Sequence, residues 1–263
     1  MNILDEIVAQ QREDLKSLRS RFSRSDFEQF EAYTIEGKSL RDAIKSSAYG
    51  IIAEIKRSSP SAGSIRPDLC VSEIAKAYDL ALAAAISVLT NTPYFGGTMA
   101  DLQTVKNSVS IPVLRKDFIV DELQLFQAKA YGADAILLIA ESLSREEMID
   151  LTQTAHEIGL EVVAECHSHE TMLKIPLEVD VIGVNNRDLK RQVTDLTISE
   201  GLINYLPDSL VKITESGIRN ANDLARLKDL GYQGALIGEH FMKADDPGEE
   251  LHKFHTELNT HAD

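Results

Sequence analysis

A lysine stands at the end of a short apolar segment near the middle of the chain. Residues 113–115 lead directly into Lys116, which is followed by Asp117 and Phe118. Burying an unpaired ammonium group is very costly, so a lysine in this place needs solvent or an acidic partner. A protonated amine held there can donate its proton to a substrate oxygen. A lone lysine of this kind is more often a loop residue, so its role depends on what other segments bring to the same place.

Similar apolar segments recur, and most end in a residue that could bind or transfer a proton. Glu54 and Lys56 are two residues apart, so they point to the same side of a strand. Carboxylates can act as general bases, while amides and hydroxyls can orient a substrate. An ion-pair network that only stabilises the fold is the alternative interpretation. In chain order these residues are Glu54, Lys56, Asn91, Lys116, Glu141, Glu165, Asn185, Arg187, Glu215, Ser216, Gly217, Gly238 and Glu239.

The elements that must position these residues form a repeating pattern from residue 51 onward. Eight apolar strand-like segments alternate with segments whose apolar residues recur at helical spacing. Near-continuous apolar strands suit a parallel sheet covered on both faces and joined by right-handed crossovers. Eight units in about 215 residues predict an α/β fold, a (β/α)8 TIM barrel forming one domain over residues 49–263, with its active site at the carboxyl ends of the strands. The predicted strands are residues 51–55, 86–89, 113–115, 135–140, 160–164, 181–184, 210–213 and 235–237.

An open doubly wound sheet is the alternative to the barrel. That fold favours a glycine-rich turn after the first strand, and residues 56–60, Lys-Arg-Ser-Ser-Pro, are not one. Polar residues typical of helix starts support the predicted boundaries. They are Ser72, Ser144 and Asn220.

The first 48 residues have a different character. They are rich in charge, and no glycine or proline occurs before Gly37. Their apolar residues share one helix face, so we predict a helical extension over residues 1–48 that packs on the barrel. That face comprises Leu4, Ile7, Val8, Leu15 and Leu18.

The composition restricts the classes of partner. The chain has 263 residues, of which 43% are hydrophobic and 26% charged, as in ordinary globular proteins. A net charge of −15 argues against nucleic acid or an anionic membrane as partner. No apolar run is long enough to span a membrane, and the acidic N-terminus lacks the features of a signal peptide. We expect a cytoplasmic monomer with no nucleic-acid or membrane partner.

Cysteine and histidine usage indicates no metal centre. Cys70 and Cys166 are far apart and form no metal-binding pair or disulfide framework. His167 and His169 are two residues apart, and the interpretation of this pair as metal ligands is weak. We therefore predict no metal site.

The loops after the last two predicted strands favour phosphate. Residues 216–218, Ser-Gly-Ile, follow the seventh strand, and Gly238 and Glu239 follow the eighth. Phosphate sites of barrels of this kind form at these two loops, where glycine lets backbone N–H groups approach the oxygens. Residues 59–63 could add hydroxyl groups or move as a lid. Each glycine taken alone is also typical of an ordinary turn.

Six motifs, in this order, resemble the indole-3-glycerol-phosphate synthase family of tryptophan biosynthesis. The resemblance runs from the N-terminal extension to about Met242. The motifs are Ala53-Glu54-Ile55-Lys56-Arg57-Ser58-Ser59-Pro60-Ser61, Tyr94-Phe95-Gly96-Gly97, Leu114-Arg115-Lys116-Asp117-Phe118-Ile119, Gly132-Ala133-Asp134-Ala135-Ile136-Leu137-Leu138-Ile139, Gly183-Val184-Asn185-Asn186-Arg187-Asp188-Leu189 and Glu215-Ser216-Gly217-Ile218.

The resemblance implies a substrate and a reaction. The substrate is 1-(2-carboxyphenylamino)-1-deoxyribulose 5-phosphate, which closes to an indole ring with loss of carbon dioxide and water. Such an enzyme is a carboxy-lyase and uses no cofactor or metal. The family also carries an N-terminal helical extension of about this length.

The resemblance also implies roles for individual residues. Lys116 resembles the general acid that protonates the ketone oxygen, and Glu165 the general base that assists loss of the hydroxyl. Lys56 resembles a lysine that contacts the substrate and shares acid duty. Other implied catalytic residues are Glu54, Asn185, Glu215 and Ser216. Implied binding residues are Arg187 for the anthranilate carboxylate or for orienting Glu54 and Glu215, Phe118 for the aromatic ring, and Ser59, Gly217, Gly238 and Glu239 for phosphate.

Three places depart from the family pattern. Asn91 stands where a glutamate is expected, and Glu141 where an apolar or small residue is usual. Gly238-Glu239-His240 replaces the commoner Gly-Ser-Ser or Gly-Glu-Ser. These departures bear on phosphate binding and substrate fit, and they leave Lys116 and Glu165 untouched.

Two other functions are weighed against this one. A sugar-phosphate isomerase on the same barrel, such as phosphoribosylanthranilate isomerase, would need an aspartate or cysteine acid–base pair where Lys56 and Glu165 stand. A barrel kept only to bind phosphate or a partner would not need the lysine–glutamate set. Both are disfavoured by these residues.

Overall fold

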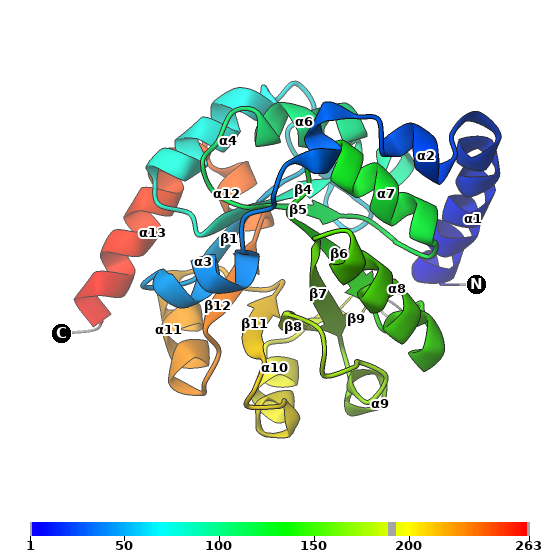
Figure 1. Cartoon of the computed structure of the whole chain (residues 1–263). Coiled ribbons are helices and arrows are strands. Elements are labelled where there is room, and N and C mark those ends of the chain that lie inside the picture. Colours follow the sequence, from blue (N-terminus) through cyan, green and yellow to red (C-terminus); the bar gives the residue numbers. More distant parts are fainter. Residues whose placement is uncertain (1, 189–192, 262–263) are drawn as a thin grey trace.

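The computed structural model of the chain describes residues 2–188 and 193–261. Residue 1, residues 189–192 and residues 262–263, which belong to the predicted extension and barrel, lie outside the described part. Eight parallel strands close into a barrel, in which each strand pairs with its two neighbours (Figure 1). The predicted (β/α)8 barrel is confirmed. The strands are β1 (Ile51–Ile55), β4 (Ala85–Leu89), β5 (Val113–Lys116), β6 (Ala135–Ile139), β7 (Glu161–Cys166), β8 (Val181–Asn185), β11 (Val211–Glu215) and β12 (Gly234–Ile237).

Helices surround the barrel because each carries one apolar face that the sheet can cover. The C-terminal helix α13 (Pro247–His261) packs on α4 and α11 and buries Leu251, Phe254 and Leu258. Ser72 was predicted to stand just before the first of these helices. That was wrong by two positions, because the residue before α4 is Cys70 and the helix begins at Val71. The other helices are α4 (Val71–Leu80), α5 (Thr92–Phe95), α6 (Met99–Lys106), α7 (Glu122–Ala130), α8 (Arg145–Glu157), α9 (His169–Met172), α10 (Thr197–Leu202), α11 (Ala221–Asp229) and α12 (Glu239–Lys243), with a 3-10 turn η2 (Ile203–Tyr205).

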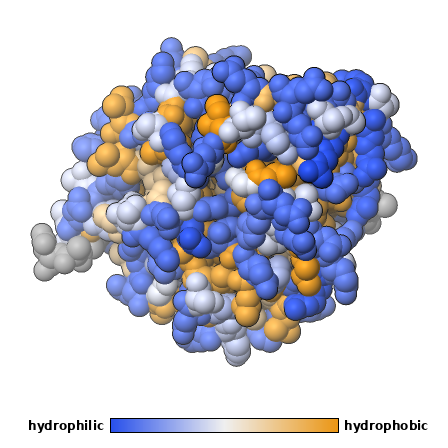
Figure 2. Space-filling view, viewed as in Figure 1, coloured by the Kyte–Doolittle hydropathy of each residue, from blue (hydrophilic) through white to orange (hydrophobic). Residues whose placement is uncertain are grey.

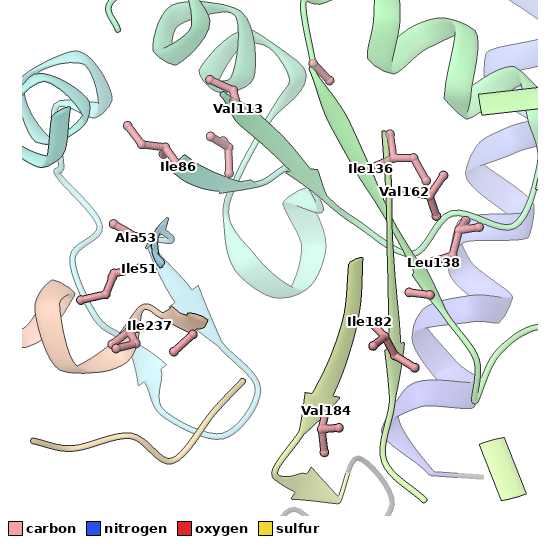
Figure 3. Close-up of a cluster of buried hydrophobic side chains, with 14 of the residues drawn as sticks. Ile51, Ala53, Ile86, Val113, Ile136, Leu138, Val162, Ile182, Val184 and Ile237 are labelled. Atoms are coloured by element: carbon pink, nitrogen blue, oxygen red, sulfur yellow. The ribbon is translucent and has the colours of Figure 1, made fainter. Parts of the chain in front are cut away.

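The strands alternate between two apolar layers. Outward-facing strand residues pack against the helices in the cluster shown in Figure 3, which includes Ile51, Ala53 and Ile86. Inward-facing residues such as Ile52 and Leu114 fill the barrel interior. The same alternation points Glu54, the residue two after Ile52, into the barrel.

The N-terminal residues form α1 (Ile3–Arg21), α2 (Arg24–Phe27), η1 (Glu31–Thr34) and α3 (Leu40–Ser46). In Figure 1, α1 and α2 lie in dark blue beside α7 and α8. Arg12 of α1 pairs with Glu147 of α8, and Arg19 pairs with Asp121, the N-cap residue of α7. Helices α1 and α2 therefore pack beside α7 and α8, whereas α3 contacts β4 and β11.

The surface in view in Figure 2 is mainly hydrophilic, with apolar residues in small groups. Among the described helices, none is both long and apolar enough to cross a lipid bilayer.

Candidate active site

A cavity opens at the carboxyl ends of the barrel strands. The catalytic and binding residues that the family resemblance implied all line it except Glu215, whose carboxylate contacts Lys116. The segments at the carboxyl ends of β1, β5, β7, β8, β11 and β12 thus meet at one end of the closed barrel. The predicted residues on its wall are Glu54, Lys56, Ser59, Lys116, Phe118, Glu165, Asn185, Arg187, Ser216, Gly217, Gly238 and Glu239.

Lys116 is the last residue of β5 and is held between two carboxylates. Its Nζ lies 2.9 Å from Oε2 of Glu215 and 3.2 Å from Oε2 of Glu54. Burial alone would lower the pKa of the Lys116 ammonium, but the charges of Glu215, Glu54 and Glu165 outweigh burial and raise it. Lys116 is therefore a fixed, protonated donor at neutral pH.

Glu54 joins both lysines of the site. Oε1 of Glu54 lies 2.5 Å from Nζ of Lys56, while Oε2 faces Lys116. Burial would raise the pKa of Glu54, yet the two ammonium groups dominate and lower it to about 2. Glu54 is thus ionised at neutral pH, and its charge holds two cations in the cavity.

Glu165 has the opposite electrostatic character. It is 3% exposed, and its Oε1 accepts a 2.9 Å hydrogen bond from Nδ2 of Asn185. Burial and the charge of Glu215 raise the pKa of Glu165 to about 8, although Lys116 and the Asn185 hydrogen bond act against this rise. Two carboxyl groups with pKa values pushed apart are the usual mark of separate proton-transfer roles.

The loops after β11 and β12 bring backbone close to the cavity. Ser216 and Gly217 both have left-handed backbones, with φ of 65° and 82°. A Cβ at Gly217 would lie 2.6 Å from Cγ2 of Thr194, and one at Gly238 would lie 2.3 Å from Oε1 of Glu54. Both positions therefore require glycine, which leaves main-chain N–H groups open to a ligand.

Arg187 ties three loops together above the cavity. It begins the short strand β9 (Arg187–Asp188), which pairs with β10 (Val193–Thr194). Its guanidinium donates hydrogen bonds to the hydroxyl of Ser61 and, at 3.3 Å, to that of Thr194, and lies 3.5 Å from Glu239. These contacts are with Ser61, Thr194 and Glu239, not with Glu54 or Glu215, the carboxylates it was alternatively expected to orient. Leu189, the last residue of the predicted motif, lies outside the described residues.

An apolar wall faces the charged one, and the sequence did not reveal most of it. Ile3, Leu4 and Ile7 of α1 line the cavity beside Phe95 and Phe118. The rings of Phe95 and Phe118 pack with their centroids 6.1 Å apart. The apolar face of the extension and the Tyr-Phe-Gly-Gly motif were visible signals, but neither indicated that both would reach the same cavity.

A buried polar network supports β5 from behind. Arg115, which is 2% exposed, pairs with Asp117 at 2.9 Å and donates to the carbonyl oxygen of Gln124. The hydroxyl of Thr90 donates to Asp117, and the amide of Gln124 donates to the carbonyl oxygen of Phe118. These bonds fix the backbone on both sides of Lys116. Within residues 2–188 and 193–261, no group of three or more His, Cys, Asp or Glu side chains is placed to hold a metal ion.

The comparisons with known proteins agree with the geometry. A family model described as indole-3-glycerol phosphate synthase matches residues 4–254. The chain belongs to this family. A relative with that name from Bacteroides thetaiotaomicron is 43% identical over 253 residues, which cover 96% of this chain and 97% of the relative. Another, from Geobacillus thermodenitrificans, is 48% identical over 201 residues, covering 76% of this chain and 78% of the relative.

Solved structures at lower identity show the same fold. Thiamine phosphate pyrophosphorylase from Pyrococcus furiosus matches with a TM-score of 0.61 and 16% identity, covering 84% of this chain and 98% of the other. The 3-hexulose-6-phosphate synthase from Salmonella typhimurium matches with a TM-score of 0.62 and 14% identity, covering 80% and 99%. Membership of the indole-3-glycerol phosphate synthase family does not favour the isomerase alternative.

Two of the departures from the family pattern lie off the cavity wall. Asn91 caps α5 by accepting a hydrogen bond from the N–H of Tyr94, and its Nδ2 donates to Gln11 of α1. Glu141 turns toward the loop after β7 and binds the N–H of His167. The expectation that Asn91 and Glu141 bring polar groups to the mouth was therefore wrong, although Leu89 and Ile139, the last residues of the two strands before them, do line the cavity. The directions of the Asn91 and Glu141 side chains are set by the backbone conformation of each loop, and the two-residue period of a strand does not predict that conformation.

Proposed function

We propose that this chain is a carboxy-lyase that makes indole-3-glycerol phosphate for tryptophan biosynthesis. Its substrate would be 1-(2-carboxyphenylamino)-1-deoxyribulose 5-phosphate, and its other products carbon dioxide and water. The observation that carries the proposal is the position of Lys116, an ammonium held by Glu54 and Glu215 in a cavity that also contains Glu165. Membership of the family supports the same reaction.

The first step forms the five-membered ring. The aromatic carbon that carries the carboxylate attacks the ketone carbon, and Lys116 gives a proton to the ketone oxygen, which becomes a hydroxyl. Carbon dioxide then leaves, and the electron pair of its bond restores the aromatic ring. A preorganised cation at the oxygen lowers this barrier because negative charge grows there in the transition state.

The second step removes water. The hydroxyl takes a proton from Lys56 or Lys116 and departs, while Glu165 accepts a proton from the ring carbon next to nitrogen. Two protons are donated and one is accepted, which matches the conversion of a carboxylate into neutral carbon dioxide. The raised pKa of Glu165 makes its ionised form a stronger proton acceptor than an exposed glutamate.

The remaining wall of the cavity suits the rest of the substrate. We assign the phosphate to the hydroxyl of Ser59 and the backbone of Gly217, Gly238 and Glu239. Phe118 supplies a ring face for the anthranilate moiety, and Arg187 a guanidinium for its carboxylate. In this arrangement the ketone lies between the phosphate loops and the aromatic wall, where Lys116 can reach it.

An assay with purified protein tests the proposal. Indole fluorescence should grow when the carboxyphenylamino substrate is added, and phosphoribosylanthranilate should not be consumed. Folded protein that produced no indole signal would exclude the synthase, and turnover of phosphoribosylanthranilate would point to the isomerase. We also propose a cytoplasmic monomer with no nucleic-acid or membrane partner, and light scattering after gel filtration checks the monomer.

A further inference from the structure

Glu141 occupies an unusual place beside the site. It follows β6 by two residues and is half-buried. Its Oε1 accepts two hydrogen bonds of 2.7 Å, from the N–H of His167 and from the hydroxyl of Thr171. Its Oε2 is buried and has no hydrogen-bond partner in the described part of the chain. Leaving such an atom unsatisfied costs free energy, so the position needs a compensating explanation.

The groups bound by Glu141 lead to Glu165. The ring Nδ1 of His167 lies 3.0 Å from the carbonyl oxygen of Asn185. The side-chain amide of Asn185 in turn donates to Oε1 of Glu165. The residue before Glu141 makes a second link, because the N–H of Ala140 donates to the carbonyl oxygen of Glu165 at 2.9 Å. Glu141 therefore anchors the loop that follows β7, at a position that does not line the cavity.

We propose that Glu141 is a positioning residue for Glu165, whose carboxylate fixes the loop after β7 and keeps a negative charge beside the Glu165 carboxyl. This inference rests on the proposed role of Glu165 as a proton acceptor. Glu141 does not line the cavity, so it acts through Glu165 and not on the substrate.

The charge of Glu141 is not cancelled by a nearby cation. Lys174 binds the carbonyl oxygens of Ala140 and Leu143 on either side, and no ion pair joins it to Glu141 among the described residues. Glu141 adds to burial and to Glu215 in raising the pKa of Glu165, and it also raises that of the neighbouring Cys166 thiol. The charged and titratable groups around this centre are Glu54 on β1, Lys116 on β5, Cys166 on β7, His167 and Lys174 after β7, Asp188 on β9 and Glu215 on β11.

Changing Glu141 to glutamine separates charge from shape. Glu141→Gln keeps an oxygen that can accept from His167 and Thr171, but it removes the negative charge. The acid limb of the pH profile of kcat/KM should move to lower pH by about half a unit to one unit. Thr171→Val is the matched variant that loses the loop hydrogen bond and keeps the charge. It should lower kcat without moving the limb, and Glu146→Gln, an exposed change nearby, should leave the profile as in the wild type.

A direct titration keeps this test independent of turnover. Carbon-13 NMR of labelled glutamate carboxyls, with Glu165→Gln for assignment, reports the Glu165 titration whether or not the protein is a synthase. A lower midpoint in Glu141→Gln supports the proposal, and an unchanged midpoint overturns it. If the wild type makes no indole product, the proposed function fails while the NMR result still decides the role of Glu141. Should Glu141→Gln not fold, Glu141→Ser removes the same charge, and the same shift is expected.

Discussion

Replacing Glu165 with glutamine should stabilise the protein while abolishing most of its turnover. Burial and the nearby charge of Glu215 raise the pKa of Glu165 from an ordinary 4.5 to about 8. Ionising this carboxyl at neutral pH therefore costs free energy in the folded chain but not in the unfolded chain. Glutamine has nearly the same shape and can still accept the hydrogen bond from Asn185, but it never ionises.

The sign and size of the effect follow from proton linkage. Between pH 4.5 and about 8, the folded state holds the Glu165 proton while the unfolded state has released it, so stability falls as the pH rises. Below pH 4.5 both states are protonated and the cost is absent. One pKa unit corresponds to about 1.4 kcal/mol, so complete ionisation costs at most about 5 kcal/mol. Relaxation of the site reduces this figure, and we expect a difference of roughly 2–5 kcal/mol.

Urea unfolding of both proteins, followed by circular dichroism from about pH 5 to about pH 9, measures the difference. The free energy of unfolding of Glu165→Gln should match the wild type at the acid end and exceed it increasingly toward the alkaline end. The exposed change Glu146→Gln serves as control and should show no such trend. A difference that stayed constant with pH, or one that favoured the wild type at alkaline pH, would refute the reasoning.

Three further outcomes are expected. Lys116→Ala should lower kcat by about 10²–10⁴-fold with KM within a few-fold, and a near-normal rate in steady-state assays would exclude Lys116 as the acid. Gly217→Ala should raise KM roughly tenfold, because its backbone is left-handed and its Cβ would meet Thr194; an unchanged KM contradicts this. Asp117→Asn should cost about 3 kcal/mol in urea unfolding, because it leaves the Arg115 guanidinium buried with a weaker partner, and an unchanged midpoint would argue against that.

The sequence alone determined the barrel and the order of its strands. A strand can be recognised from a local apolar run, and the number of strand–helix units from the length of the chain. Neither depends on how the elements are arranged in space. The ion pair between Glu54 and Lys56 was also predictable, since a two-residue spacing on a strand places both side chains on one side. Lys116 was predicted at the carboxyl end of its strand, and it is the last residue of β5, which extends one residue beyond the predicted range 113–115. The extra residue belongs to the strand because Lys116 pairs with Leu89 of β4.

Tertiary structure decided which strand ends reach the cavity. Glu141 and Asn91 follow strands as Glu165 and Lys116 do, yet their side chains turn to neighbouring loops. The direction of a side chain beyond a strand depends on loop dihedrals, for which the alternation of the strand carries no information. For the same reason the apolar face of α1 predicted a buried helix but not its position over the cavity, beside residues nearly a hundred positions away.

The protonation states are also a tertiary property. Glu54 and Glu165 are the same residue type. Both are 3% exposed, and both lie next to the last residue of a barrel strand. The first lies 2.5 Å and 3.2 Å from two ammonium groups, and its pKa falls to about 2. Burial raises the pKa of the second, and the charge of Glu215 adds to this rise, so that the pKa reaches about 8. The sequence named the residues that carry the chemistry, whereas the distances between their charges decided which of them holds a proton, because Coulomb energies depend on separation in space and not along the chain.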